Sequence, residues 1–382
     1  MIKGFKNVNV YVEGLGIVKR SIEVKNGKIV KIAERIDNDK DFITLDEDKI
    51  VIPGFIDKHI HGANNSDGMY PNLDDSRNIS KTIASEGVTS YLITTMTQTV
   101  ENIDAALKNA KEFIALDEHC GAKAIGVHLE GPFISKKHKG AQVESCIIPC
   151  SVEKFKHFQE VSGNNIKEVT LAYEENGKEL VNYLRDTHVV ASLGHTDATC
   201  EQCLEAVKEG ATSFTHTYNA MKGLHHREAG TVGAAFLSDA YCEMICDLVH
   251  LQNYAIMVLY KVKGKDKLCA ITDGIEAKHL PDGKYQLGGQ PVYVKGKEAR
   301  LIDGTLAGST LWMNDAVRNI KNVLNIPLTD AVDMASKNPA MNLGIYDTKG
   351  SIKEGKDADF AVIDNDLNVY MTISEGIVVY QK

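Results

Sequence analysis

Two histidines with one residue between them, His59 and His61, follow the apolar segment 51–56. Side chains two positions apart on an extended chain project from the same face, so both imidazoles can reach one ion. The pair alone is a weak signal, because a histidine at the end of a strand is more often an ordinary polar residue. It nevertheless makes metal-assisted chemistry the first hypothesis to compare with the rest of the chain.

Further candidate metal ligands and acid–base groups follow other apolar segments. Glu130, His195, His216, His250 and Asp273 each come shortly after such a segment. In a barrel of parallel strands, the carboxyl ends of the strands form the face that carries the active site. These side chains all follow the ends of predicted strands. Their joint pattern therefore predicts a metal centre, which none of them would predict alone.

Eight apolar segments can supply the strands of such a barrel. They cover residues 51–56, 88–94, 124–129, 169–172, 189–193, 212–214, 241–246 and 268–271. Helical stretches lie between most of them, such as 74–86 before Gly87 and 197–209 before Gly210. This alternation predicts an α/β fold, a (β/α)8 TIM-like barrel. A doubly wound open sheet is the alternative, but no glycine-rich dinucleotide loop follows the first predicted strand.

The two ends of the chain show a different pattern, with short apolar segments separated by turns. Asn26-Gly27 lies between residues 22–24 and 28–30 and predicts a β-hairpin. The C-terminal segments 350–352, 359–363 and 376–379 repeat this style. We therefore expect a small β-sandwich domain formed by residues 1–51 and 346–382, and a barrel domain formed by residues 52–345.

The composition is that of an ordinary globular protein and limits the classes of partner. The 382 residues are 43% hydrophobic and 25% charged, with a formal net charge of −9. A negative chain of this kind is not expected to bind nucleic acid or a membrane surface, and it shows neither a signal peptide nor a long apolar span. The 8 cysteines are scattered, which favours reduced thiols and a cytoplasmic protein. Cys200 and Cys203 lack a matching second pair, so we interpret them as structural helix residues rather than a redox or zinc motif.

Several motifs together resemble one enzyme family. They read, in chain order, PGFID, HIH, HLEGPF, LGHTDAT, FTHTYNAM, HHREAG, TDG and GTLAGS. From about Pro53 to Gly344 the sequence resembles the N-acetylglucosamine-6-phosphate deacetylase family of the amidohydrolase superfamily, and the terminal β segments resemble that family's accessory domain. The resemblance implies hydrolysis of the acetamide of a phosphorylated amino sugar, giving the free amine and acetate.

The resemblance also implies a set of metal ligands. Glu130, His195 and His216 would hold the main ion, and the presence of His59 and His61 implies a second ion bridged by Glu130. One or two divalent ions per subunit are thus expected. Nitrogen and oxygen ligands suit Zn²⁺ or Fe²⁺ first, with Mn, Co and Ni as further candidates.

Asp273 and His250 are the expected catalytic residues. A metal-activated water would attack the acetyl carbonyl, with Asp273 as general base toward that water and then general acid toward the leaving amine. Asp273 would also contact the second ion, if one is bound. The resemblance places a functional histidine at position 250, which would either polarise the carbonyl or hold a sugar hydroxyl. These two roles are left open.

The substrate's phosphate requires cations or backbone donors. His226 and Arg227 form the best basic cluster in the expected region, and the family supplies further substrate contacts at Asn219 and Ala220. Gln142, where many relatives have His, is expected to contact the sugar. In the family this arginine reaches the site of a neighbouring subunit, so the resemblance implies a homodimer.

The chain departs from the family pattern at two further positions. Ala229 replaces a common proline, which predicts a less rigid loop around Arg227. Leu248 takes the place of a glycine that usually follows the aspartate at 247. Neither departure removes a candidate metal ligand or Asp273.

Three alternatives to this function remain. The chain could deacetylate the galactosamine epimer, which differs at one hydroxyl. It could be another amidohydrolase, although several of those bridge two metals with a modified lysine where this chain has Glu130. A catalytically silent scaffold of the same fold is an alternative of a different class, but such proteins typically lose the ligands that this chain keeps.

Overall fold

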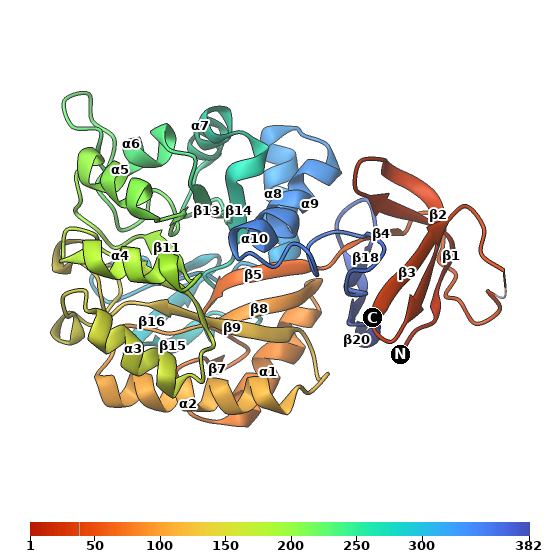
Figure 1. The fold of residues 1–382 in the computed structure, drawn as a ribbon, viewed down its shortest axis with the longest axis horizontal. Coiled ribbons are helices and arrows are strands. Elements are labelled where there is room, and N and C mark those ends of the chain that lie inside the picture. The colour runs from red at the N-terminus through yellow and green to blue at the C-terminus, as the bar shows by residue number, and fades with distance from the viewer. Residues whose placement is uncertain (38) are drawn as a thin grey trace.

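Eight parallel strands form the central barrel of the computed structural model, which describes residues 1–37 and 39–382 (Figure 1). They are β5 (Phe55–Ile60), β8 (Val88–Thr94), β9 (Lys123–Glu130), β10 (Ile166–Leu171), β11 (Val190–Leu193), β12 (Ser213–Phe214), β13 (Tyr241–Ile245) and β14 (Leu268–Ile271), neighbours in that order. Two backbone hydrogen bonds, from Asp273 N to His59 O and from His61 N to Gly274 O, close the barrel between the end of β14 and the end of β5. Both are 2.9 Å long. The predicted (β/α)8 barrel is confirmed.

Helices surround the strands, as the alternating pattern predicts. They are α1 (Leu73–Ala84), α2 (Val100–Leu116), α3 (Val152–Val161), α4 (Gly177–Asp186), α5 (Cys200–Glu209), α6 (Gly230–Leu237), α7 (Asn253–Lys263), α8 (Met313–Leu324), α9 (Leu328–Ala335) and α10 (Lys337–Asn342), with short 3₁₀ turns at Lys136–His138, Glu144–Cys146 and Lys265–Lys267. The helix predicted over 197–209 begins only at Cys200, because Thr199 and Gln202 form a capping box there. Among the described helices, none has the length and apolar character needed to cross a membrane.

The first predicted strand, 51–56, is wrong as a single barrel strand. The structure divides it into β4 (Ile50–Pro53), which pairs with strands from the chain ends, and β5, which pairs with β8. Gly54 separates them: its N–H bonds to Asp359 O, whereas the N–H of Phe55 bonds to Gly87 O. A Cβ at Gly54 would lie 2.2 Å from the side chain of Thr89. A continuous apolar run cannot reveal such a change of hydrogen-bonding partner.

Both chain ends contribute to one seven-stranded sheet, which lies beside the barrel and contains both termini (Figure 1). Its order is β20 (Ile377–Gln381), β19 (Val369–Ser374), β18 (Phe360–Ile363), β4, β1 (Gly4–Val12), β2 (Gly16–Lys25) and β3 (Lys28–Ala33). The predicted hairpin at Asn26-Gly27 is confirmed, with Lys25 opposite Lys28 and positive φ at both turn residues. The segment 350–352 is not a strand, although Ile352 is buried in the core of this sheet.

The seven-stranded sheet has an apolar core of its own. Phe5 on β1 packs edge-to-face against Phe360 on β18, with ring centroids 5.5 Å apart. Residues from both ends of the chain share this one apolar cluster, which is separate from the barrel core. The β-sandwich character expected of the chain ends is therefore present. The division at residues 51/52 and 345/346 stays a prediction.

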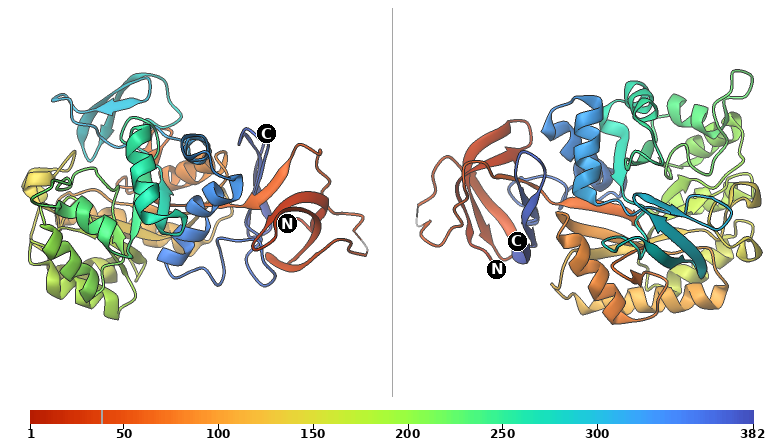
Figure 2. Two further views of the ribbon diagram at one scale, coloured as in Figure 1. Left: turned by 90° about the horizontal axis from the view of Figure 1, so that it is seen from above. Right: turned by 180° about the vertical axis from the view of Figure 1, so that it is seen from behind.

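Two small sheets were not predicted. One pairs β6 (Gly62–Ala63) with β7 (Ser66–Asp67); the other contains β15 (Gly283–Leu287), β16 (Gln290–Lys295) and β17 (Glu298–Arg300). The three-stranded sheet, which we call the cover sheet, projects over one end of the barrel, as the cyan strands in the left view of Figure 2 show. Gly288-Gly289 at its first turn, between alternating apolar residues, is a hairpin signal that could have revealed it.

Candidate active site

Six predicted residues meet at the carboxyl ends of the barrel strands. We call them the histidine–carboxylate cluster: His59, His61, Glu130, His195, His216 and Asp273. His59 lies on β5 and Glu130 ends β9, while the other four follow β5, β11, β12 and β14. All six are buried, although they are polar. Buried polar groups normally need partners, so the arrangement of their ligand atoms decides what the cluster can do.

Glu130, His195 and His216 form one group that could hold an ion. Glu130 Oε1 lies 3.3 Å from His195 Nε2 and 3.2 Å from His216 Nε2, and the two nitrogens are 3.1 Å apart. A metal with bonds of about 2.0–2.1 Å holds neighbouring ligand atoms roughly 2.8–3.4 Å apart in octahedral or tetrahedral geometry. The spacing of these atoms therefore fits a single divalent ion.

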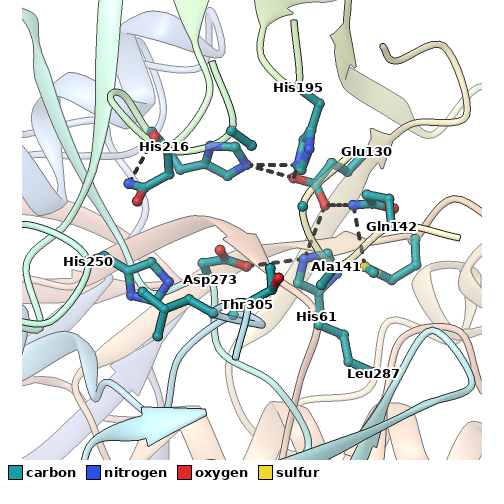
Figure 3. Close-up of a pocket in the computed structure, with 16 residues that line it drawn as sticks. His61, Glu130, Ala141, Gln142, His195, His216, His250, Asp273, Leu287 and Thr305 are labelled. Carbon is teal, nitrogen blue, oxygen red and sulfur yellow. Dashed lines mark hydrogen bonds and ion pairs between the residues drawn. The ribbon is translucent and has the colours of Figure 1, made fainter. Parts of the chain in front are cut away.

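His59, His61 and Glu130 form a second group that shares the same carboxylate. His59 Nε2 lies 3.3 Å from Glu130 Oε1, and His61 Nε2 lies 3.3 Å from Glu130 Oε2. Asp273 Oδ1 lies 3.2 Å from His61 Nε2 and 3.6 Å from His59 Nε2. The two groups thus adjoin through Glu130, and Asp273 lies beside the second (Figure 3).

The charges of the cluster favour a cation. Burial disfavours a charge on His59, but Glu130, Asp273 and Glu243 together hold the pKa of His59 well above its ordinary value. The pKa of Glu130 is well below its ordinary value: burial would raise it, and the neighbouring histidines outweigh that effect. Buried His59 Nε2 finds no hydrogen-bond partner among the described residues. A metal ion can supply the positive charge and satisfy this nitrogen, so the residues fit a divalent cation.

Three members of the cluster have left-handed backbone conformations. The φ angles are 47° at His195, 28° at His216 and 49° at Asp273. Such angles are uncommon for residues other than glycine and cost of order 1–3 kcal/mol each. Strain of this kind persists where the surrounding structure imposes it and is concentrated at functional sites. The conformation aims these side chains into the cluster.

A cavity of about 190 Å³ opens directly onto the cluster. The predicted residues that line it are His61, Glu130, Gln142, His195, His216, Asn219, Ala220, His250 and Asp273. His59 lies beneath them, with its side chain fully buried. No site prediction included the other lining residues, which are Met96, Gly140 and Ala141, together with Leu287, Thr305, Leu306 and Gly308 from the cover sheet and the loop after it.

Gln142 has a contact that its predicted role did not include. Its amide nitrogen donates a 2.6 Å hydrogen bond to Glu130 Oε2, and its carbonyl oxygen accepts one of 2.7 Å from Thr97 N. The side chain therefore holds Glu130 in place, while it also forms part of the cavity wall.

His250 is oriented by its neighbour Asp247. Asp247 Oδ2 accepts a 2.7 Å hydrogen bond from His250 Nδ1, and Oδ1 accepts two from backbone N–H groups of the same turn. Burial lowers the pKa of His250, but Asp247 outweighs this effect, so the net shift is upward. Leu248 in this turn has a φ of 67°, in the left-handed region that favours glycine.

The structure does not bring His226 and Arg227 into the cavity. Both are exposed on the loop between β12 and α6, and Arg227 Nη1 lies 2.7 Å from His226 Nε2. The loop is closed at its base by reciprocal backbone hydrogen bonds between His225 and Glu228. Within this chain Arg227 is therefore on the outer surface, free to contact something outside it.

The chain belongs to the amidohydrolase family, whose sequence profile matches residues 50–379. An N-acetylglucosamine-6-phosphate deacetylase of Bacillus subtilis (strain 168) is 41% identical over 98% of this chain and 96% of its own length. An N-acetylgalactosamine-6-phosphate deacetylase of Escherichia coli O157:H7 is 35% identical, covering 87% of this chain and 89% of its own. These matches confirm the resemblance that the motifs predict.

The fold is similar over the whole chain to a solved relative. The crystal structure of N-acetylglucosamine-6-phosphate deacetylase from Thermotoga maritima matches with a TM-score of 0.90 and 37% identity. The match covers 99% of this chain and 100% of that one. Barrel and end sheet are therefore both shared with that enzyme.

Proposed function

We propose that the protein hydrolyses the acetamide of N-acetylglucosamine 6-phosphate to glucosamine 6-phosphate and acetate. The observation that carries this proposal is the pair of ligand groups sharing Glu130, with Asp273 beside them, at the base of the cavity. The near full-length similarity to an N-acetylglucosamine-6-phosphate deacetylase supports the choice of substrate.

Glu130, His195 and His216 would hold one ion, and His59, His61 and Glu130 a second. The ligands are imidazole and carboxylate, which suits Zn²⁺ or Fe²⁺ and also admits Mn, Co or Ni. When bound, a divalent ion polarises a carbonyl and lowers the pKa of water from about 15.7 to about 7.

Asp273 and His250 act as the acid–base and orienting groups. Asp273 accepts a proton from the attacking water and returns it to the leaving amine, which needs a buried carboxylate next to the reacting carbon. Its pKa is low: burial would raise it, but His59 and His61 outweigh burial, so the side chain starts as the base. His250, fixed by Asp247, lies across the cavity from Leu287 and contacts the carbonyl or a sugar hydroxyl (Figure 3).

The apolar wall of the cavity receives the acetyl methyl. Met96, Ala141 and Leu287 share one buried apolar cluster. Gln142 joins that wall to the metal ligands, since its amide nitrogen contacts both Glu130 Oε2 and, at 3.6 Å, Met96 Sδ. A carbonyl carbon held at the cluster therefore has an apolar surface beside it for its methyl group. Asn219 and Ala220, which also line the cavity, are left for the sugar and its phosphate.

The phosphate extends out of the cavity to a second subunit. A cavity of about 190 Å³ is smaller than the roughly 300 Å³ at the lower end for ligand sites. Arg227, exposed on its own chain, is available to complete the site of a partner in a homodimer, with His226 beside it. Bidentate contact from a guanidinium suits a phosphate.

An apolar stripe near this loop supports the dimer. Tyr254, Val258 and Val262 on α7 are 80%, 47% and 47% exposed and recur every fourth residue, so they share one face of the helix. Leu237 at the end of α6 and Leu224 in the loop are 71% and 58% exposed. Apolar faces of this kind mark protein interfaces.

The state of the cysteines and one of the relatives bear on the compartment and on the alternative substrate. The 8 cysteines are all free thiols, which suits a cytoplasmic protein. Cys200 and Cys203 are buried in α5, in line with a structural role. The N-acetylgalactosamine relative keeps that epimer as the second candidate substrate.

The test is release of acetate by the purified protein from the two epimers, before and after chelation. We expect turnover of N-acetylglucosamine 6-phosphate that chelation abolishes and divalent ions restore. Faster turnover of the galactosamine epimer would replace the proposed substrate. No release after reconstitution with several metals would favour another amide or a silent scaffold.

A further inference from the structure

Glu243 on β13 contacts ligands of both metal groups without reaching the cavity. Its side chain is fully buried inside the barrel. Oε2 lies 3.0 Å from His59 Nδ1 and accepts a 3.0 Å hydrogen bond from the backbone N–H of His216. One carboxylate oxygen therefore connects β5 with the turn after β12, which carry ligands of the second and first groups respectively.

The contact with His59 determines which ring nitrogen faces the metal site. An ionised carboxylate is only an acceptor, so His59 Nδ1 must be the donor. In the neutral ring, the other nitrogen, Nε2, then carries the lone pair that a metal requires, and it lies 3.3 Å from Glu130 Oε1. Carboxylates that bind a ligand histidine in this way fix its tautomer and its ring orientation.

Lys58 supplies the counter-charge of Glu243 in the fully buried interior of the barrel. Lys58 Nζ lies 2.7 Å from Glu243 Oε1 and 2.5 Å from Glu168 Oε1, and all three side chains are fully buried. A buried charge of this kind is costly without a counter-charge. The irregular register of β5 between Asp57 and Ile60 allows the successive residues Lys58 and His59 both to contact Glu243.

We propose that Glu243 is the positioning residue of the metal centre: it fixes His59 with Nε2 toward the ion and anchors the backbone of His216, while Lys58 supplies its counter-charge. The proposal rests on the proposed function only in that the cluster binds metal. Its clearest consequence concerns the ion held by His59 and His61, since that ion depends on the tautomer of His59.

Glu243→Gln separates this role from simple packing. If the amide oxygen points to Lys58, the amide NH₂ faces His59 Nδ1 and imposes the wrong tautomer. If the oxygen points to His59, the NH₂ group faces the Lys58 ammonium, and two donors oppose each other. Glu168→Gln is the matched control, because Glu168 contacts Lys58 but no histidine of the cluster.

The experiment measures Zn²⁺ binding to the apoprotein by titration against a chromophoric chelator. Comparison of the wild type with His61→Asn shows which Zn²⁺ binding step requires His61. That step is the binding of the ion at His59 and His61. Glu243→Gln should weaken that step by about 10- to 100-fold, the usual effect of losing such a partner. Glu168→Gln should leave it within about twofold of the wild type. Deacetylation by Glu243→Gln should recover as Zn²⁺ is raised, which a general packing defect would not allow.

A second variant and the following outcomes can refute the proposal. Should Glu243→Gln not fold, Glu243→Asp keeps the charge for Lys58 but is too short for both His59 and His216, so it should weaken the same step. Unchanged affinity in a folded variant, or equal weakening by Glu168→Gln, overturns the proposal. A wild-type protein with no step sensitive to His61→Asn overturns it as well. Metal binding without acetate release would instead refute the proposed function alone.

Discussion

The histidine–carboxylate cluster and the Arg227 loop, residues 224–228, differ in how fully one chain specifies them. Each member of the cluster is buried and has partners from other strands, and Glu130 alone contacts four histidines. The Arg227 loop is exposed and rests mainly on its own backbone hydrogen bonds. In the function that we propose, the chemistry is therefore prepared within the monomer, whereas recognition of the phosphate depends on a surface that a second subunit would complete.

The same contrast predicts which kinetic property a mutation in each region will change. Changes in the cluster should reduce turnover, because its groups act on the reacting atoms. Changes in the Arg227 loop should chiefly weaken binding of the phosphorylated sugar. Changes in the apolar wall should alter which acyl group is accepted.

Asp273→Asn should have the largest effect. The amide cannot accept the proton of the attacking water, so kcat should fall by about 10²- to 10⁴-fold. Metal content should stay near that of the wild type, because Glu130 and the four histidines remain. Acetate release and elemental analysis of the same preparation measure both quantities. Full activity in this variant would refute the assigned role of Asp273.

The sequence could predict that these residues lie together because each is at or near the carboxyl end of an apolar strand. It could not predict the left-handed backbone at His195, His216 and Asp273, which the assembled barrel imposes. Nor could it assign Glu243 or Lys58, since charged residues within strands give no sign of their partners across a barrel. The division of residues 51–56 at Gly54 was missed for a related reason: the change of sheet depends on Asp359, far away in the chain.

Arg227→Ala should have the second-largest effect. Hydrogen bonds to charged groups contribute about 1.5–3 kcal/mol, so KM for the phosphorylated sugar should rise about 10- to 100-fold with kcat less affected. Lys136→Ala, which removes another exposed cation, should leave KM unchanged. Equal loss with the unphosphorylated sugar would show that Arg227 does not bind the phosphate.

Mixed dimers test whether Arg227 acts in the site of the other subunit. Co-expression of Asp273→Asn and Arg227→Ala subunits yields hybrids in which one site has Asp273 from one chain and Arg227 from the other. Activity of these hybrids at low substrate should exceed that of either variant alone. No gain in purified hybrid dimers would place Arg227 in the site of its own chain.

Leu287→Ala should have the smallest effect on the acetylated substrate and the clearest effect on selectivity. Leu287 is 2% exposed and shares the cover-sheet core with Val292, which is fully buried and does not line the cavity. Shortening Leu287 makes room for one more methylene, whose fit is worth about 1–3 kcal/mol in an apolar pocket. The ratio of kcat/KM for N-propionyl over N-acetyl substrate should therefore rise about tenfold. Val292→Ala removes apolar volume from the same core without changing the lining of the cavity. If this variant also raised the ratio of kcat/KM, the effect would come from general loosening of the cover sheet and not from the apolar wall.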